Sequence, residues 1–428
     1  MNLLLIYLLP VALLLIAAGA LDERRVARAA TVAVVGLALA LVVYGLVGFG
    51  FQFGGVGLVN SAPGLKSLVR EWSPLDVVVG RGWGLIGLDG FGVLAQPVNT
   101  DAMNLLLYHA VVAGAAVLLP VLAVAARVRS RVILVGAFLL AAVFFPIAGN
   151  WVWGGGWLSQ MGMTSGLGHG LVDFAGGGVL FLFGGFAALG ALVGSGARTH
   201  TAVTTAANIP EFPSAHLPLL MILGAFLFLV SLGAFVFGNP FPLKNLPTTL
   251  IVYNLVFAAS AGLLVATLYG WFVSGEPSAM LASRGAVAGV AAIAASLPFV
   301  PGWAALVIGG VAGLLLPLTT YAIDRWLRID DAGLVASTFG VAGAWGLIAL
   351  AIFADGQYGI GWNNTGPSSY LGVPNQGVSG IFVLSSFVPD SPGQMEAQFF
   401  GVIAIGLLAF LTAWAVFYAL RKVGAAAD

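Results

Sequence analysis

The sequence predicts an all-α polytopic membrane protein. Of its 428 residues, 60% are hydrophobic and only 7% are charged, and the mean hydropathy is +1.05. The apolar residues also occur in runs long enough to cross a bilayer, which takes about 20 residues in a helix. Soluble domains carry roughly 25% charged residues, which they need to cover their surface with polar groups. Most of this chain therefore has lipid as its solvent.

The composition excludes several other classes of protein. The 16 Lys and Arg residues balance the 16 Asp and Glu residues, so the chain lacks the basic excess of a nucleic-acid binder. There is no Cys, which excludes a disulfide scaffold. Strands of a membrane β-barrel alternate apolar and polar residues, whereas the apolar runs here are uninterrupted. The shortage of charge also excludes a soluble enzyme.

Eleven predicted spans follow from these runs. The eighth is short, and Pro298 and Pro301 separate it from the ninth by an expected tight turn. We expect the first span to be a retained helix, because its Arg cluster follows the apolar run, whereas a secretory signal carries its charge first. The spans cover residues 2–20, 30–50, 103–126, 132–152, 174–195, 217–238, 248–273, 285–299, 301–323, 334–353 and 397–420.

The distribution of Lys and Arg orients these spans. With the N-terminus outside, eleven crossings put twelve basic residues on internal segments and four on external ones, which is the asymmetry of the positive-inside rule. We therefore expect a cytoplasmic C-terminus and an integral protein of a prokaryotic plasma (inner) membrane. Two long external loops, residues 51–102 and 354–396, are predicted to fold as a vestibule. Capture of substrate by these loops is the alternative.

A weak internal symmetry relates two of the spans. The fifth opens on Asp173-Phe174-Ala175-Gly176-Gly177, and the tenth contains Thr338-Phe339-Gly340-Val341-Ala342-Gly343. Five spans separate them, so the two copies run through the membrane in opposite senses. This pattern predicts one transmembrane domain over residues 1–428, with inverted halves at about 1–195 and 216–353 and a final helix at 397–420. Inverted repeats place the conduction path at their interface, near the midplane.

Few residues in the spans can ionise, and a charge at the bilayer centre costs at least about 2.5 kcal/mol. His109 lies in the third span and is either a packing residue or a titratable group of a pore. Asp173 starts the fifth span, where it can cap the helix, attract a cation to an external mouth, or do both. The sequence contains no metal-spaced His cluster, paired carboxylates or nucleophile constellation. We therefore expect no enzyme activity, no metal and no cofactor.

Aromatic residues near the outer surface have two interpretations. Trp151, Trp153 and Trp157 are expected in an aromatic belt at the interface, but one of them could instead hold a small cation against its ring. Such a contact is worth up to about 2 kcal/mol once the cation is desolvated. Phe235 either fills a core position or gates a pore.

Two blocks, Trp151-Val152-Trp153-Gly154-Gly155-Gly156-Trp157-Leu158 and Asp173-Phe174-Ala175-Gly176-Gly177, resemble the ammonium transporter family at this spacing. This family includes the Amt, Mep and Rh proteins. The resemblance extends over essentially the whole chain. It implies a homotrimer with one narrow apolar pore in each subunit. Supporting similarity comes from Phe145-Pro146-Ile147-Ala148, from Asn254, and from Asp330-Asp331 ahead of Phe339-Gly340-Val341.

The resemblance also implies roles for single residues. Trp153 matches the Trp that recruits ammonium, Asp173 matches the family's Asp, and Asn239 falls where a Ser usually completes the aromatic cage. Phe235 matches one gate Phe. Val112 falls where the second gate Phe is expected, and His109 takes the place of a Gln.

The largest departure from the family lies inside the pore. Two hydrogen-bonded His residues normally line its middle and take part in deprotonating ammonium and relaying its proton. Phe181 and Ala342 occupy those positions here, so both imidazoles are absent. A bare ammonium ion would then face apolar walls, which is very costly. Phe181 is larger than His and can plug the path, while Ala342 opens some space.

Three functions remain open from the sequence. The first is a permease or gas channel that moves ammonium or ammonia through an apolar pore in each subunit. The second is a non-conducting paralogue, which would be an ammonium-binding or structural subunit of a membrane assembly. The third is passage of another small neutral solute, such as carbon dioxide. The short tail after Lys422 lacks the segment through which family members meet PII regulators, so we expect no such partner.

Overall fold

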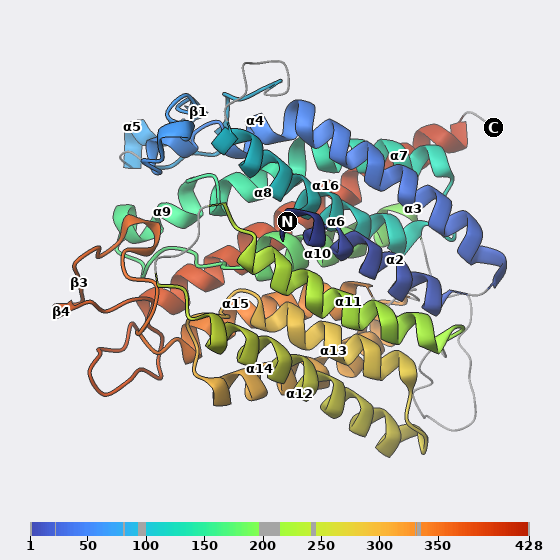
Figure 1. Cartoon of the computed structure of the whole chain (residues 1–428). Helices are drawn as coiled ribbons and strands as arrows, with labels where there is room; N and C mark the ends of the chain where they lie inside the picture. Colours follow the sequence, from blue (N-terminus) through green and yellow to red (C-terminus); the bar gives the residue numbers. More distant parts are fainter. Residues whose placement is uncertain are drawn as a thin grey trace.

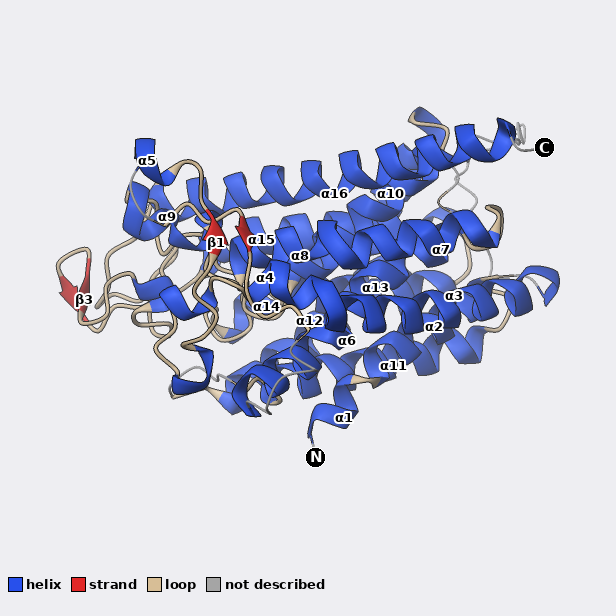
Figure 2. Ribbon diagram, turned by 90° about the horizontal axis from the view of Figure 1, so that it is seen from above, coloured by secondary structure: helices blue, strands red, loops and turns tan. Residues whose placement is uncertain are grey.

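The computed structural model describes residues 2–21, 23–79, 82–92, 100–196, 215–240, 245–329, 331 and 335–426. Asp330, which contributes to the family resemblance, lies outside these residues. Helices run along one common direction, and most loops gather at one end (Figures 1 and 2). The helices are α1 (Asn2–Ile6), α2 (Leu8–Ala20), α3 (Glu23–Val43), α4 (Phe49–Phe53), α5 (Asp76–Val79), α6 (Thr100–Val124), α7 (Ser130–Leu139), α8 (Phe145–Val152), α9 (Trp157–Ser165), α10 (Phe183–Ser195), α11 (Pro218–Phe237), α12 (Thr248–Ser274), α13 (Ala279–Ile293), α14 (Gly302–Tyr321), α15 (Ala342–Phe353) and α16 (Gly393–Ala426).

The prediction of an all-α membrane protein is confirmed. Within the described ranges, nine continuous helical segments are long and apolar enough to cross a bilayer, and two shorter apolar helices cover Leu4–Ala20 and Ala279–Ile293. Each of the eleven predicted spans coincides with one of these segments. The nine long segments reach full spanning length, whereas a crossing by each of the two shorter helices stays a prediction.

Several boundaries differ from those expected. The eighth span was predicted at 285–299, but α13 covers Ala279–Ile293, and the chain turns between Ser296 and Pro301. The Ser278 side chain accepts a hydrogen bond from the N–H of Leu281 and so caps the helix N-terminus. Arg284, which the charge distribution placed on an internal segment, is therefore buried within this helix with 2% of its surface exposed.

Short π-helical segments continue or precede several helices. The segments are η1 (Tyr44–Gly48), η5 (Leu140–Phe144), η6 (Gly177–Leu182), η7 (Ala322–Trp326) and η8 (Ala336–Val341). The fifth predicted span consequently begins at Gly177, not at residue 174, and the tenth begins as η8. Local π geometry of this kind is frequent at functional sites.

Small residues let the helices pack closely. A Cβ atom on Gly190 of α10 would collide with the backbone of Phe410 in α16, and one on Gly194 would collide with Trp414 one turn further along. Close approach of backbones is the usual route to stable helix pairs in lipid, because no hydrophobic effect draws helices together there. Helices α12, α13 and α14 form a second closely packed group (Figure 1).

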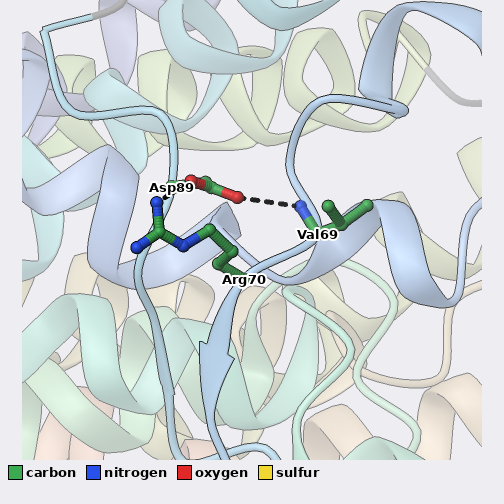
Figure 3. Close-up of polar contacts among 3 residues, drawn as sticks. All are labelled: Val69, Arg70 and Asp89. Carbon is green, nitrogen blue, oxygen red and sulfur yellow. Dashed lines mark hydrogen bonds and ion pairs between the residues drawn. The ribbon is translucent and has the colours of Figure 1, made fainter.

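The two long loops fold over one end of the bundle. In the first, β1 (Glu71–Trp72) pairs antiparallel with β2 (Ile86–Gly87); in the second, β3 (Ser369–Tyr370) pairs antiparallel with β4 (Val373–Pro374). Figure 3 shows how Asp89 ties the first loop together: its Oδ2 accepts a hydrogen bond from the N–H of Val69 at 3.2 Å, and its Oδ1 lies 3.7 Å from the guanidinium of Arg70. The C-terminal end of α16 lies at the opposite end (Figure 2).

Candidate functional site

A cavity of about 140 Å³ lies where the two long loops meet the helix ends, and we call it the outer cavity. A small cation of the size of a water molecule needs about 30 Å³, so the outer cavity can hold one with room for water. Aromatic rings form most of its wall. The lining residues are Phe53, Val56, Asn60, Leu65, Leu105, Tyr108, His109, Trp153, Asp173, Phe174, Phe235, Asn239 and Trp362.

Trp153 is held in a fixed orientation at this wall. It ends α8, and its indole Nε1–H donates a hydrogen bond of 2.9 Å to the backbone carbonyl of Asp173. The ring centroid lies 5.1 Å from that of His109 and 6.4 Å from that of Phe235. Because the polar edge of the indole is bonded, its π face remains the surface that a cation can contact.

Asp173 is buried beside this ring with 1% of its surface exposed. Its Oδ2 accepts hydrogen bonds from the N–H groups of Gly178 at 3.0 Å and Val179 at 2.8 Å, at the start of η6. Gly176 has φ +87°, a conformation that favours glycine, and it turns the chain so that these amides face the carboxylate. Oδ1 is buried without a partner in the described part of the chain.

The Asp173 carboxylate is consequently under opposing influences. Burial raises its pKa to about 6, while the hydrogen bonds from Val179 and Gly178 lower it. A cation in the outer cavity would stabilise the charged form, and it could bond to Oδ1, which has no partner among the described residues.

His109 lies on α6, and its ring packs among three other rings. Its centroid is 4.6 Å from Phe53, 4.9 Å from Tyr108 and 5.1 Å from Trp153. Nδ1 is buried and has no hydrogen-bond partner among the described residues, and 6% of the side chain remains exposed. Since His109 also lines the outer cavity, its imidazole is a candidate partner for a ligand bound there.

Phe235 and Asn239 complete the side of the outer cavity formed by the end of α11. Phe235 stacks on Tyr108 with centroids 4.6 Å apart and planes 14° apart, and the Tyr108 hydroxyl donates to the Phe235 carbonyl at 2.8 Å. The stacking contact and the hydrogen bond together hold Phe235 at the cavity wall.

Deeper in the bundle, three buried phenylalanines form what we call the aromatic cluster: Phe181, Phe228 and Phe339. Their centroids are 5.5 Å apart for Phe181–Phe228, 5.8 Å for Phe181–Phe339 and 5.9 Å for Phe228–Phe339. Phe228 lies seven residues before Phe235 on α11, about 10 Å further from the loop-rich end. The aromatic cluster therefore lies below the outer cavity and fills that part of the bundle interior with apolar rings.

The structure brings together five of the eight site residues that the sequence singled out. All five line the outer cavity: Trp153, Asp173, Phe235, Asn239 and His109. The other three lie outside the lining of the outer cavity. Phe181 is in the aromatic cluster, Val112 is fully buried on α6, and Ala342 is buried where α15 begins.

Sequence reasoning missed several residues of both sites. Trp362 belongs to the Gly-rich and Asn-rich second loop, whose lone Trp was a usable signal. Phe339 stands in the Phe-Gly-Val block, but its contact with Phe181 depends on how the two halves pack. No sequence pattern distinguishes the remaining residues from other core aromatics: Phe53, Tyr108 and Phe228.

Aromatic faces, a buried carboxylate oxygen and an imidazole nitrogen together suit a small cation that carries N–H donors. The described residues contain no group of three or more His, Cys, Asp or Glu that could hold a metal ion. The family model of the Ammonium Transporter Family matches residues 1–425.

The chain belongs to the ammonium transporter family.

Relatives in this family are moderately similar in sequence. The chain is 34% identical over 290 residues to the ammonium transporter Amt2 of Archaeoglobus fulgidus, an alignment that covers 66% of this chain and 61% of that protein. It is 31% identical over 280 residues to a putative ammonium transporter of Synechocystis, covering 63% of this chain and 61% of the relative. The chain thus spans about six tenths of the length of these relatives.

Solved structures of this family share the fold. A structure titled Sensor Amt Protein superposes with a TM-score of 0.76 at 23% identity, covering 99% of this chain and 92% of that one. Mep2 of Candida albicans superposes with a TM-score of 0.74 at 21% identity, covering 99% and 83%. At these identities the likeness shows the fold alone.

Proposed function

We propose that this protein is an ammonium transporter that binds ammonium in the outer cavity and passes it inward as neutral ammonia. The single observation that carries the proposal is the outer cavity itself. It combines a fixed Trp153 ring with Oδ1 of Asp173 and Nδ1 of His109, two buried atoms that have no hydrogen-bond partner among the residues the structure describes. The named relatives supply the substrate class, since their names describe ammonium transporters.

Neutral passage follows from what lies below the cavity. An ion in the aromatic cluster would lose its hydration and meet three phenyl rings that offer no hydrogen bond. Ammonia has no charge to desolvate, so it crosses such a region at far lower cost. The rings are in contact in this structure, and we propose that transport requires them to separate transiently.

Each residue of the site has a role in this proposal. Trp153 holds the cation by its π face, Asp173 supplies the compensating charge, and Asn239 contributes a polar group at the rim. Phe235 separates the outer cavity from the interior. Phe181 and Ala342 take the place of polar groups along the path. Val112 puts a small side chain at the second gate position.

We further propose one transmembrane domain of two inverted halves, about 1–195 and 216–353, with a final helix at 397–420. The protein would be a homotrimer in a prokaryotic plasma membrane, with its N-terminus outside. The matching positions of Asp173 before η6 and Asp331 before η8 support the inverted relation.

Ammonia uptake into proteoliposomes tests the function. An ammonium gradient applied outside vesicles that trap a pH dye should raise the internal pH faster than in empty vesicles, because entering ammonia takes up protons inside. Equal rates in protein-containing and empty vesicles would refute transport. Retained ammonium binding with no uptake would instead favour a binding protein.

A further inference from the structure

We infer that His109 is the proton acceptor that converts bound ammonium to ammonia in the outer cavity. This inference rests on the proposed function and adds a chemical step to it. If only neutral ammonia crosses the aromatic cluster, a base must remove one proton before that point. The base must also touch the cation while Trp153 and Asp173 still hold it.

Few side chains can serve as this base. Among the described residues that line the outer cavity, the titratable side chains are His109, Asp173 and Tyr108. The Tyr108 hydroxyl already donates to the Phe235 carbonyl, and a phenol is neutral at physiological pH, so it is a poor base. The choice therefore lies between the imidazole and the carboxylate.

The geometry favours the imidazole. Two backbone N–H groups, from Gly178 and Val179, bond to Asp173 and stabilise it as an anion. A proton on this carboxylate would weaken those bonds and remove the charge that retains the cation. Protonation of His109 would break no such hydrogen bond at Nδ1, because this atom is buried without a partner in the described ranges.

The distances allow contact with a bound cation. The rings of His109 and Trp153 are 5.1 Å apart, and an ammonium ion held against a Trp face lies within about 6 Å of its centroid. Both rings also line the outer cavity, so a cation held there on the Trp153 face shares the cavity with the imidazole.

The step balances as a single proton transfer. One N–H bond of ammonium breaks and its proton binds a ring nitrogen of His109, giving ammonia and an imidazolium ion. Ammonia moves inward through the aromatic cluster. The imidazolium returns its proton to water in the outer cavity, so the net event is inward movement of ammonia with the proton left outside.

The test compares His109→Gln with wild type. Gln keeps hydrogen-bonding atoms at this position but cannot accept a proton. We expect ammonium binding, measured by calorimetry, to change less than threefold, while the ammonia uptake rate falls at least tenfold, within the range of lost general-base catalysis. His216→Gln, at an exposed His outside the cavity, is the matched control and should behave as wild type.

The outcomes separate this inference from the proposed function. If wild type itself takes up no ammonia, the proposed function fails. If wild type transports and His109→Gln transports equally fast, only the role of His109 is overturned. Equal losses of binding and uptake would make His109 a cation ligand and would also overturn its role as the base. Unchanged size-exclusion profiles and thermal unfolding show that each variant is folded.

Discussion

Phe181 and Phe339 stack against each other with ring centroids 5.8 Å apart and planes 24° apart. Each lies eight residues after an aspartate, Asp173 or Asp331, whose carboxylate accepts backbone N–H bonds at the start of a π-helical segment. Two equivalent turns from distant parts of the chain thus bring one phenyl ring each to the middle of the bundle. The contact between them fills this part of the interior with apolar rings.

Phe181→Ala should open this contact. Removal of the ring leaves Phe228 and Phe339 with a gap between them, so we expect ammonia uptake to become faster in proteoliposomes. The same change should lower the free energy of unfolding by about 3–5 kcal/mol, as truncation of a buried Phe usually does. Phe417→Ala is the control, because Phe417 is fully buried against Gly136, away from the aromatic cluster. A loss of stability in both variants with slower uptake in Phe181→Ala would contradict the assignment.

Trp153→Leu should weaken ammonium binding by about tenfold, since it removes the π face and the hydrogen bond to the Asp173 carbonyl. Calorimetry with ammonium chloride at low ionic strength measures this change. Trp151→Leu is a matched control: Trp151 also donates its Nε1–H to a backbone carbonyl, that of Leu85, but it does not line the outer cavity. Equal ammonium affinity in the two variants would show that Trp153 has only a structural role.

Asp331→Asn should destabilise the protein strongly. Arg284 is buried with 2% exposure, its Nε has no partner in the described part of the chain, and Asp331 supplies a nearby negative charge. Leaving a buried charge uncompensated costs up to about 3–5 kcal/mol, and the change also weakens the hydrogen bonds that Asp331 accepts from the N–H groups of Ser337 and Val335. Thermal unfolding followed by tryptophan fluorescence measures the effect. The double variant Arg284→Met, Asp331→Asn should recover much of the loss; if it is as unstable as the single variant, the charge pair is not the cause.

His169 should make the protein sensitive to acid. Both ring nitrogens are buried without partners among the described residues, and burial lowers the pKa from 6.5 to about 4. As the pH falls, the imidazole is protonated first in the unfolded chain, which shifts the equilibrium toward unfolding. The free energy of unfolding that this group contributes above pH 6.5 is therefore lost as the pH falls toward 4, by up to about 3 kcal/mol.

His169→Phe removes this titration and keeps the packing against Tyr370, whose ring centroid lies 4.2 Å away. No described hydrogen bond is lost, because Gln394 and Asn363 bond to the backbone of His169, not to its ring. Unfolding temperatures of the variant should fall less steeply than those of wild type between pH 6.5 and 4. Parallel curves would show that other groups control the acid response.

Much of the fold could be predicted from the sequence because lipid imposes simple rules. Apolar runs in the sequence located the nine long and two shorter apolar helical segments of the described residues, and the blocks around Trp153 and Asp173 indicated the site. Boundaries were less predictable. The sequence predicts that this span begins at residue 285, after Arg284, but α13 begins at Ala279 and the guanidinium is buried within it near Asp331.

Contacts between distant segments could not be predicted. The aromatic cluster depends on α11 packing Phe228 between η6 and η8, and no local pattern distinguishes Phe228 from the other 27 Phe residues of the chain. Phe53 of α4 likewise contacts the His109 ring of α6, and no local pattern in the sequence pairs these two residues. Such positions follow from packing and not from the sequence pattern.

The central claim is that ammonium binds as a cation and crosses as neutral ammonia. Simultaneous recording of membrane current and internal pH on proteoliposomes tests it most directly, because the two signals give the charge moved per ammonia delivered. The account predicts rapid internal alkalinisation with no protein-dependent current. One charge moved with each ammonia would contradict it, because the cation or its proton would then cross the aromatic cluster.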